Sequence, residues 1–302
     1  MEADPTVRRL GAALGVDAPA LLHERVAVDG DRATATRLLP TSDGWVAVSL
    51  ARADDVELVP AWVGTSSLEE GLAAMTAAHA VERGRLLGLP VSTPGERAPG
   101  DLYHCTSLGQ APPLRRAPLV VDLSSLWAGP LCTRLLRERG ATVIKVESSS
   151  RPDGARSGSP AFFEILNAGK ECVRVDFTAA ELLPLLRSAD VVVEGSRPRA
   201  LEQLGIDAAA LVREGPRVWL SVTGHGRTSP QRDWVAFGDD AAVAGGLVRW
   251  DEGVPHLVGD AVADPLTGMA AAVAVLDLLA RGGRWLVDCN LAGVAAHVAG
   301  AA

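Results

Sequence analysis

Several common functional signatures are missing from this sequence of 302 residues. It contains no C-x-x-C pair, and its four cysteines, Cys105, Cys132, Cys172 and Cys289, lie far apart. This pattern is typical of buried thiols in a reducing compartment, so we expect a cytoplasmic protein without a disulfide framework. The six histidines are scattered along the chain, and no metal site is expected.

Excess positive charge and long apolar runs are also absent. The 29 lysines and arginines stand against 37 acidic residues, which gives a net charge of -8. A general nucleic-acid binder would instead show a basic face. We find no apolar run of the roughly 18 residues that cross a bilayer. The acidic N-terminus also lacks the apolar core of a secretory signal. We therefore expect neither a nucleic acid nor a membrane as a partner.

The chain is long enough for two domains that each bury a core. Its 48% hydrophobic content with mixed charge indicates globular order. A proline- and arginine-containing stretch at residues 110–116 is typical of an exposed linker. We therefore predict a small α+β domain over residues 1–110, a linker at residues 111–117 and an α/β domain over residues 118–302.

The most informative stretch, residues 119–147, has the pattern of a strand, a turn, a helix and a second strand. Leu119 to Leu123 is an apolar run, and Ala128-Gly129-Pro130 suits the start of a helix. Gly140 ends that helix, and Val143 to Val146 forms the next strand. One such βαβ unit predicts a parallel sheet with a site at the carboxyl ends of its strands.

The first turn of this unit lacks the glycines that a dinucleotide site requires. A G-x-G-x-x-G turn lets the backbone approach a pyrophosphate, but here the turn carries the bulky Trp127. We therefore expect no NAD. The remaining pattern is α/β, with further strands and helices in the second domain. They are predicted at 191–194, 218–222 and 285–288 for strands, and at 180–187, 200–204 and 266–281 for helices. The helix at 266–281 is apolar on all sides and should be central.

Four motifs in order resemble family III CoA-transferases, the formyl-CoA and carnitine CoA-transferase group. D-L-S-x-x-x-A-G-P with G-A-x-V-I-K-V-E resembles the opening of that family. Three later segments are also similar to its motifs: 167–176, 189–205, and the D-x-x-x-G-M segment at 264–269. The resemblance implies an α/β fold with a parallel, Rossmann-type large domain and a smaller α+β domain.

The first 110 residues faintly resemble the small domain of the same family, which normally follows part of the large domain. The domain order is therefore expected to be atypical, and the chain stops before the return segment of typical members. The resemblance implies a homodimer, although the interlocked form of typical members is not expected with this order.

Asp264 is the candidate nucleophile that the resemblance implies. The aspartate at this place in the family attacks an acyl-CoA thioester, forms an anhydride and then carries CoA as an aspartyl thioester. From spacing alone, an aspartate before a proline at a helix start is more typical of a cap than of a nucleophile. The pair Gly245-Gly246 resembles the family's mobile loop over the aspartate, but it is also typical of a plain turn.

CoA contacts are expected near the first turn and after the later strands. The resemblance places Leu126, Trp127 and Ala128 at the adenine side, where Trp127 either stacks on the base or belongs to the core. Lys145 and Lys170 stand at motif positions and are either phosphate contacts or solvated charges. Arg197 and Arg199 could bind the phosphates where the family's usual residues are replaced.

The sequence thus predicts an enzyme that transfers CoA between an acyl-CoA and a small carboxylic acid. A first alternative is a racemase or isomerase of 2-methylacyl-CoA. The segment where racemases carry a histidine base reads Phe237-Gly238-Asp239-Asp240 here, which disfavours it. A second alternative is a non-catalytic CoA-binding or scaffold subunit that needs a partner chain.

Overall fold

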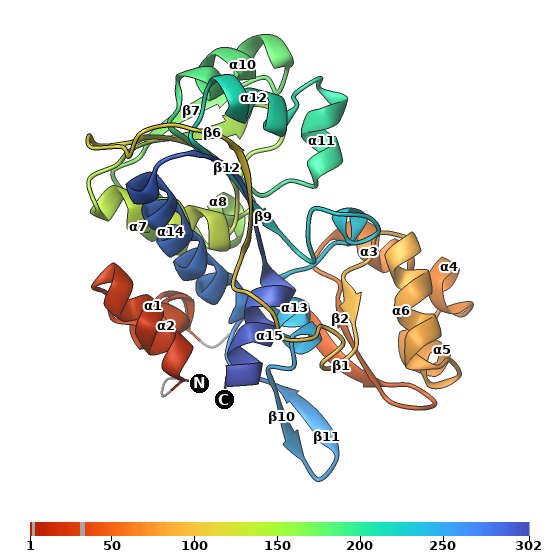
Figure 1. The fold of residues 1–302 in the computed structure, drawn as a ribbon. Helices are drawn as coiled ribbons and strands as arrows, with labels where there is room; N and C mark the ends of the chain where they lie inside the picture. Colours follow the sequence, from red (N-terminus) through yellow and green to blue (C-terminus); the bar gives the residue numbers. More distant parts are fainter. Residues whose placement is uncertain (2–3, 31–33, 302) are drawn as a thin grey trace.

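The computed structural model describes residues 1, 4–30 and 34–301, and a seven-stranded sheet forms its centre (Figure 1). Six neighbouring strands are parallel, and β4 pairs antiparallel with β12 at one edge. In sheet order the strands are β4 (His104–Gly109), β12 (Arg284–Asn290), β9 (Val218–Thr223), β8 (Val191–Glu194), β5 (Leu119–Leu123), β6 (Thr142–Ser148) and β7 (Glu171–Val175). The predicted α/β fold with a mostly parallel sheet is confirmed.

Alternate residues of the strands pack into two separate cores, one on each face of the sheet. Val120 and Val191 face one core, whereas Val121 and Val192 face the other. The first core is covered by α7 (Ala128–Glu138), α9 (Pro160–Asn167) and α14 (Ala263–Arg281). The second is covered by α10 (Ala179–Ser188), α11 (Pro198–Gln203) and α12 (Ala208–Glu214). The continuous apolar strands of the sequence are explained by burial on both faces.

Residues 36–92 form a small unit with a core of its own, centred on Trp62 and Val46. Its antiparallel sheet has the order β1-β2-β3. The elements are β1 (Thr36–Pro40), β2 (Trp45–Ser49), α3 (Ala53–Glu57), α4 (Val59–Val63), α5 (Leu68–Ala73), α6 (Ala77–Leu86) and β3 (Val91–Ser92). Residues 36–92 thus form a small α+β unit.

The predicted domain boundary at residues 111–117 does not coincide with the packing of the chain. The N-terminal arm, α1 (Pro5–Leu14) and α2 (Ala18–Asp29), buries Val7, Leu10 and Leu22 in the core around α14 and not in the small unit. The strand β4 also belongs to the large sheet, although it precedes the linker. Alternating apolar residues specify a buried face but not the element that covers it, so the sequence could not place either segment.

The helix α14 lies at the centre of the molecule, as its uniformly apolar sequence predicts (Figure 1). By length and composition alone its 19 residues could cross a membrane, which corrects our expectation that no segment is long and apolar enough. In the fold, 72% of its most apolar window is buried against the sheet and its neighbours. This burial is that of a core helix.

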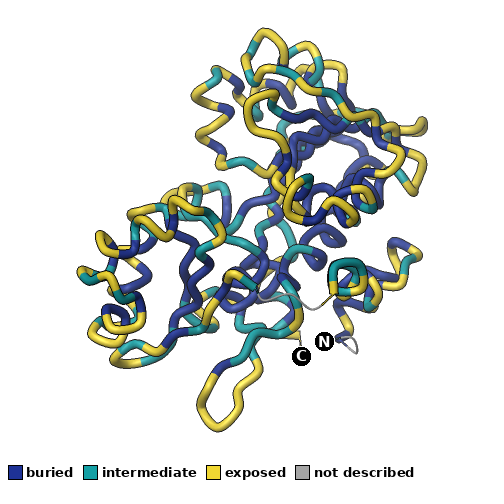
Figure 2. Tube along the Cα trace, turned by 180° about the vertical axis from the view of Figure 1, so that it is seen from behind, coloured by how far each residue is buried: buried dark blue, intermediate teal, exposed yellow. Residues whose placement is uncertain are grey.

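The remaining elements surround the carboxyl ends of the strands. They are α8 (Ala155–Gly158), the 3₁₀ helix Gln231–Asp233, α13 (Gly238–Ala244), α15 (Leu291–Ala301), and the hairpin β10 (Val248–Asp251) with β11 (Val254–Leu257). Figure 2 shows the hairpin as an exposed projection, while the central strands and α14 are deeply buried. Serines 49 and 92 of the small unit bond to Asp240 of α13, so α13 joins the two units.

Candidate active site

The order in which successive strands are added to the sheet changes sides at β5, which lies between β8 and β6. From β5 the next strands, β6 and β7, lie on one side, whereas β8, β9 and β12 lie on the other. Loops that leave two such strands diverge and open a crevice, where ligands bind in open α/β sheets. The loops that begin at Ser124 and Gly195 form one wall of a cavity here.

Asp264 lies at this crevice, in the first turn of α14. The N-cap position of the helix is occupied by Val262, and Asp264 makes no capping bond to its own helix. Its carboxylate instead accepts hydrogen bonds from the backbone amides of Ala128, which starts α7, and of Gly238, which starts α13. The interpretation of Asp264 as a helix cap is therefore wrong. Two helix N-termini converge on the carboxylate, which is an arrangement suited to an anion.

The environment of Asp264 balances opposing influences on its charge. Burial, and then the negative charge of Asp239, raise the pKa of Asp264 to about 7. The positive charge of Arg25 and the two amide bonds act in the opposite direction. A carboxylate that is poorly solvated yet still ionisable near neutral pH is more reactive than one held by water.

The start of α13 is fitted closely to Asp264. A Cβ at Gly238 would lie 2.3 Å from Asp264 Oδ2 and 2.5 Å from the carbonyl oxygen of Ala261. Only glycine therefore lets the chain present its amide to the carboxylate. The next residue, Asp239, accepts a hydrogen bond from the Ala261 amide at 2.7 Å and another from the Thr34 hydroxyl. It thereby fixes the loop that precedes α14.

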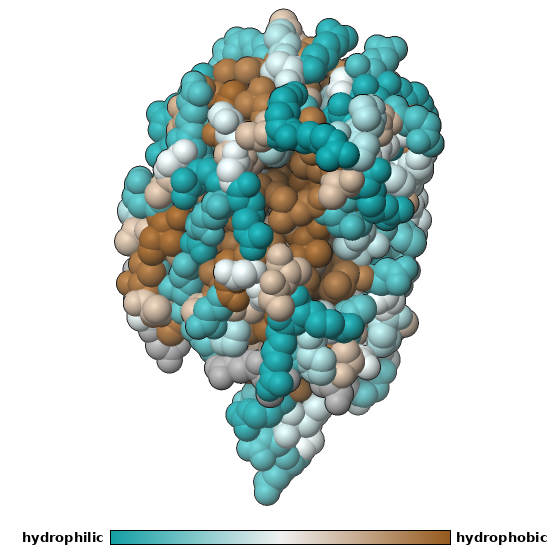
Figure 3. Space-filling model, turned by 60° about the vertical axis from the view of Figure 1, so that its left-hand side comes forward, coloured by the Kyte–Doolittle hydropathy of each residue, from teal (hydrophilic) through white to brown (hydrophobic). Residues whose placement is uncertain are grey.

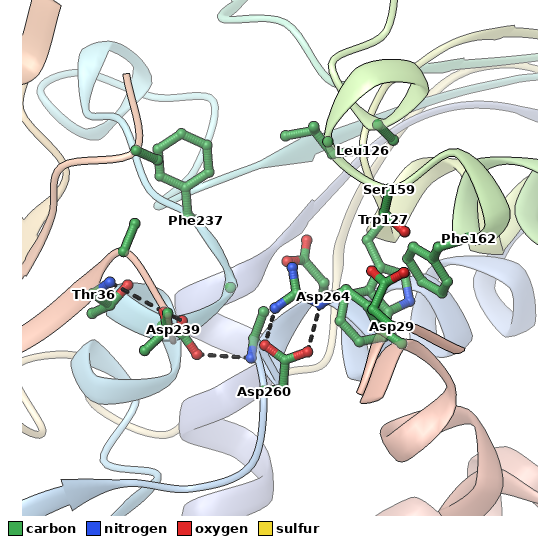
Figure 4. A pocket seen from close by; sticks show the side chains of 18 of the residues that line it. Asp29, Thr36, Leu126, Trp127, Ser159, Phe162, Phe237, Asp239, Asp260 and Asp264 are labelled. Carbon is green, nitrogen blue, oxygen red and sulfur yellow. Dashed lines mark hydrogen bonds and ion pairs between the residues drawn. The ribbon is translucent and has the colours of Figure 1, made fainter. Parts of the chain in front are cut away.

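A cavity of about 320 Å³ opens on one side of Asp264, and we call it the aromatic cavity (Figure 4). Trp127 and Phe162 pack edge to face at 4.9 Å and form one wall. Phe237 lies on the opposite side in Figure 4. The N-terminal arm and the small unit close the cavity with polar residues, including Asp29 and Thr36.

Arg25 of α2 reaches this cavity from outside the α/β domain. Its guanidinium forms two hydrogen bonds with the carboxylate of Asp260 and lies 5.4 Å from the centre of the Trp127 ring. The pairing explains the role of Asp260, the second acidic residue of the loop before α14. Arg25 therefore ties the N-terminal arm to that loop and places a positive charge near Asp264.

A second cavity, of about 310 Å³, opens on the other side of Asp264, and we call it the arginine cavity. Its lining includes Arg52, Arg151, Arg197 and Arg232. Burial, and then the positive charges of Arg199, Arg52 and Arg151, lower the pKa of Arg197. Arg197 and Arg151 form no ion pair with any residue that the structure describes. Such a concentration of positive charge favours an anionic ligand.

The predicted phosphate ligands are only partly at this cavity. Arg197 lines it, but Arg199 lies outside its lining and pairs with Asp233 at 3.5 Å. Arg52 comes from the small unit and Arg151 from the loop after β6, and neither residue belongs to a motif that would single it out. Their clustering depends on three loops that meet only in the folded chain.

Lys145 and Lys170 are neither phosphate contacts nor solvated charges. Lys145 is fully buried and bonds to Asp153 at 3.0 Å and to the Ser124 carbonyl at 2.9 Å. Lys170 is buried against Asp122 and has further acceptors at Pro130, Thr133 and Asn167. Their charges are satisfied within the protein, and these bonds brace the turn that follows β5. The prediction that Lys145 and Lys170 contact CoA is therefore wrong.

The turn residues at the end of β5 divide between the two cavities. Leu126 is exposed and lines both, Ala128 lines the arginine cavity, and Trp127 lines only the aromatic cavity. Trp127 is 3% exposed. Stacking of Trp127 on a base in the arginine cavity does not fit this position, so the core interpretation of this side chain is the better one.

The pair Gly245-Gly246 is not a lid over Asp264. Gly245 ends α13 and packs directly on α15, where a Cβ would lie 2.5 Å from the Cβ of Ala295. The preceding carbonyls of α13 bond to the amides of Gly95 and Arg97. Close helix packing, and not mobility, explains the absence of a side chain at Gly245.

Asp240 is the second acidic residue in the segment where racemases carry a base. It is fully buried, and Oδ1 accepts bonds from the Phe237 amide at 2.8 Å and the Ser49 hydroxyl at 2.9 Å. Burial raises the pKa of Asp240 to about 7, although these hydrogen bonds oppose the rise. Asp240 lines neither cavity beside Asp264, so this carboxyl is not placed to reach a substrate.

Comparison with known sequences gives a match over the second part of the chain. The sequence model of CoA-transferase family III matches residues 118–301, which is more than half of the chain. An acyl-CoA transferase of Fusarium pseudograminearum is 33% identical over 183 residues, covering 53% of this chain and 40% of that protein. A succinate–glutarate CoA-transferase of Agrobacterium fabrum is 30% identical over 190 residues, covering 54% and 47%. The chain thus spans less than half the length of these curated relatives.

Solved structures show the same fold. A hypothetical protein of Mycobacterium tuberculosis aligns with a TM-score of 0.56 and 30% identity, covering 63% of this chain and 58% of that one. A CAIB/BAIF family protein from Brucella suis aligns with a TM-score of 0.54 and 30% identity, covering 59% and 53%.

Proposed function

This chain belongs to CoA-transferase family III, and from that membership and the two cavities beside Asp264 we propose that it transfers CoA between an acyl-CoA and a carboxylic acid. The single observation that carries the proposal is the position of Asp264 between an arginine-lined and an aromatic cavity. The arginines suit the phosphates of CoA, and the aromatic walls suit an acyl group. The thioester would then lie at the carboxylate.

The proposed reaction proceeds through covalent intermediates on Asp264. An oxygen of Asp264 attacks the thioester carbonyl, the carbon–sulfur bond breaks, and CoA leaves as a thiolate from a mixed anhydride. The thiolate then attacks the aspartyl carbonyl, which releases the first acid and leaves an aspartyl-CoA thioester. The carboxylate of a second acid then attacks the aspartyl thioester, which releases the CoA thiolate and forms a second mixed anhydride. The thiolate attacks the acyl carbonyl of this anhydride, so the new acyl-CoA departs and the Asp264 carboxylate is restored.

The amides of Ala128 and Gly238 have a defined part in this scheme. They hydrogen-bond to the carboxylate of Asp264 and so fix the direction of the attacking oxygen. When the same carboxylate becomes an anhydride or thioester, its carbonyl oxygen develops negative charge during the next attack. Backbone donors already in place stabilise that charge without further reorganisation.

We extend the proposal to a homodimer that acts in the cytoplasm. Figure 3 shows apolar side chains that gather in the middle of one face and are surrounded by hydrophilic ones, as at a surface that another chain covers. The dimer and the location are predictions from the family resemblance.

Exchange of an α-proton, as in a racemase, is the less favoured alternative. It requires a base beside the α-carbon of the acyl group. The carboxyl of Asp240 has a suitable pKa, but its side chain is enclosed by Phe237 and Ser49, away from both cavities. The non-catalytic alternative predicts CoA binding without a covalent intermediate, and an attempt to trap that intermediate distinguishes it from the transferase.

Trapping of the intermediate tests the proposal. The protein is incubated with a set of acyl-CoAs and its intact mass is measured with and without hydroxylamine. A mass gain equal to CoA that hydroxylamine removes is expected for the wild type and absent from Asp264→Ala. Asp260→Asn is the matched control, because it changes the neighbouring acid but leaves the nucleophile. A wild-type protein without this mass gain, or an Asp264→Ala protein that shows it, would contradict the assignment of Asp264 as the nucleophile.

A further inference from the structure

We propose that the aromatic cavity selects monocarboxylic acids with an apolar chain and rejects dicarboxylic acids. This inference rests on the proposed function, because it identifies the substrate class of the same site. It follows from the charges, the walls and the size of the cavity.

Among the described residues that line the aromatic cavity, the charges are predominantly negative. Four aspartates, Asp29, Asp239, Asp260 and Asp264, share the lining with one arginine, Arg25. Both oxygens of Asp260 bond to Arg25, so this arginine is already paired. Among the described residues of the lining, no further cation is left to bind a second carboxylate of a substrate.

The remaining acidic groups lie where the chain of the acyl group would extend. Asp239 accepts hydrogen bonds from two neutral donors, the Ala261 amide and the Thr34 hydroxyl, and forms no ion pair with a residue that the structure describes. Asp29, at the end of α2, lies across the cavity and is half-buried. A second carboxylate on the acid would lose its water and meet like charges on both sides.

The walls of the cavity favour an apolar chain. Trp127 and Phe162 are each 3% exposed and present rigid aromatic surfaces, and Leu126 and Phe237 continue the apolar lining. The volume of about 320 Å³ is roughly twice that of a protein cavity that accepts benzene. A branched aliphatic or phenyl-substituted acid therefore fits, and removal of its apolar chain from water favours binding.

Part of this selectivity comes from outside the α/β domain. Asp29 and Arg25 belong to α2, Thr34 follows that helix, and the family match begins only at residue 118. The N-terminal arm therefore contributes Asp29 and Arg25 to the charge of the cavity, whereas residues 118–301 contribute the other three aspartates and the aromatic walls.

Matched pairs of acids test the inference. Butanoate is compared with succinate, and 3-phenylpropanoate with 3-(4-carboxyphenyl)propanoate, as acceptors from acetyl-CoA. The wild type is expected to favour each monocarboxylic acid by at least about tenfold in kcat/KM. Asp29→Asn should reduce that preference by about threefold or more, since it removes one like charge, while the charge-retaining Asp29→Glu should not. Asp29 is a residue of the cavity rim, and the melting temperature of each variant checks its folding.

Direct binding separates this inference from the proposed transfer. Saturation-transfer NMR measures binding of the same acids to wild type and Asp29→Asn, whether or not they react. If no acid is converted but the monocarboxylic acids bind better and Asp29→Asn narrows the difference, the selectivity stands and the transferase fails. Equal or tighter binding of the dicarboxylic acids, or a preference unchanged in Asp29→Asn, would overturn the inference.

Discussion

At the scale of the residue, Asp264 is distinguished by its surroundings and not by its type. The same loop holds Asp260, whose carboxylate is neutralised by Arg25, and the adjoining helix holds Asp239 and Asp240. Only Asp264 lies between the two cavities and accepts two amides from other helices. The chemical difference among four nearby aspartates is thus one of access and solvation.

The raised pKa of Asp264 predicts the pH dependence of transfer. The attacking form is the ionised one, so kcat/KM should rise with pH and level off above an apparent pKa near 7. Below that value the rate should fall about tenfold per pH unit, because the protonated acid is not a nucleophile. Rates with a slow acyl-CoA between pH 5.5 and 8.5 measure this profile.

A neighbouring substitution checks the cause of that profile. Asp239→Asn removes the charge that raises the pKa of Asp264, so the apparent pKa should move to lower pH. Asp251→Asn, on the exposed hairpin, is the control and should leave the profile unchanged. A wild-type rate that does not vary over this pH range would exclude Asp264 as the titrating nucleophile.

At the scale of the element, the start of α13 and its end use glycine for different purposes. Gly238 lets the helix begin against the Asp264 carboxylate, and Gly245 lets it end against α15. Both positions exclude a Cβ for lack of space, but only the first is at the candidate site.

The two glycines therefore give a matched pair of substitutions. Gly238→Ala should displace the Asp264 carboxylate and lower kcat by roughly 100-fold, since small misplacements of reacting groups are costly. Gly245→Ala should destabilise the protein by about 1–3 kcal/mol through overpacking on α15, yet leave the kcat of the folded protein within about threefold. Thermal unfolding and initial rates separate the two effects, and similar kcat values in both variants would contradict the proposed role of Gly238.

At the scale of the whole molecule, the candidate site is assembled from parts that lie far apart in the sequence. The arginine cavity combines Arg52 of the small unit with Arg151 and Arg197 of the large sheet's loops. The aromatic cavity combines the N-terminal arm and the small unit with Trp127, which precedes α7, and with α9 and α14. The packing of α2 and the small unit beside Asp264 thus closes the two cavities around one carboxylate.

This assembly predicts how CoA binding depends on salt. The affinity should fall as ionic strength rises, because exposed arginines hold the phosphates. Arg197→Ala should weaken CoA binding by about tenfold and flatten the salt dependence. Arg199→Ala is the comparison, since its side chain pairs with Asp233 outside the cavity and should matter less. Titration calorimetry at several salt concentrations measures both, and an equal loss in the two variants would place the phosphates elsewhere.

The association of the chain is a further prediction at this scale. The apolar area in Figure 3 and the exposed Trp250 of the hairpin are surfaces that a second chain could cover. Sedimentation at micromolar concentration should show a dimer or a larger assembly. A stable monomer at that concentration would remove this part of the proposal.

The sequence by itself determined the α/β order and the central helix α14, and it singled out Asp264 as the candidate nucleophile. Each depends on a local pattern: an apolar strand, a turn residue or a motif of adjacent positions. Only the tertiary structure decided that Lys145 and Lys170 are internal braces, that Gly245 is a packing contact, and that Arg25 and Asp29 belong to the site. The physical reason is that a local pattern specifies which residues are buried or turn the chain, whereas the partners of a charged side chain depend on which distant elements pack beside it.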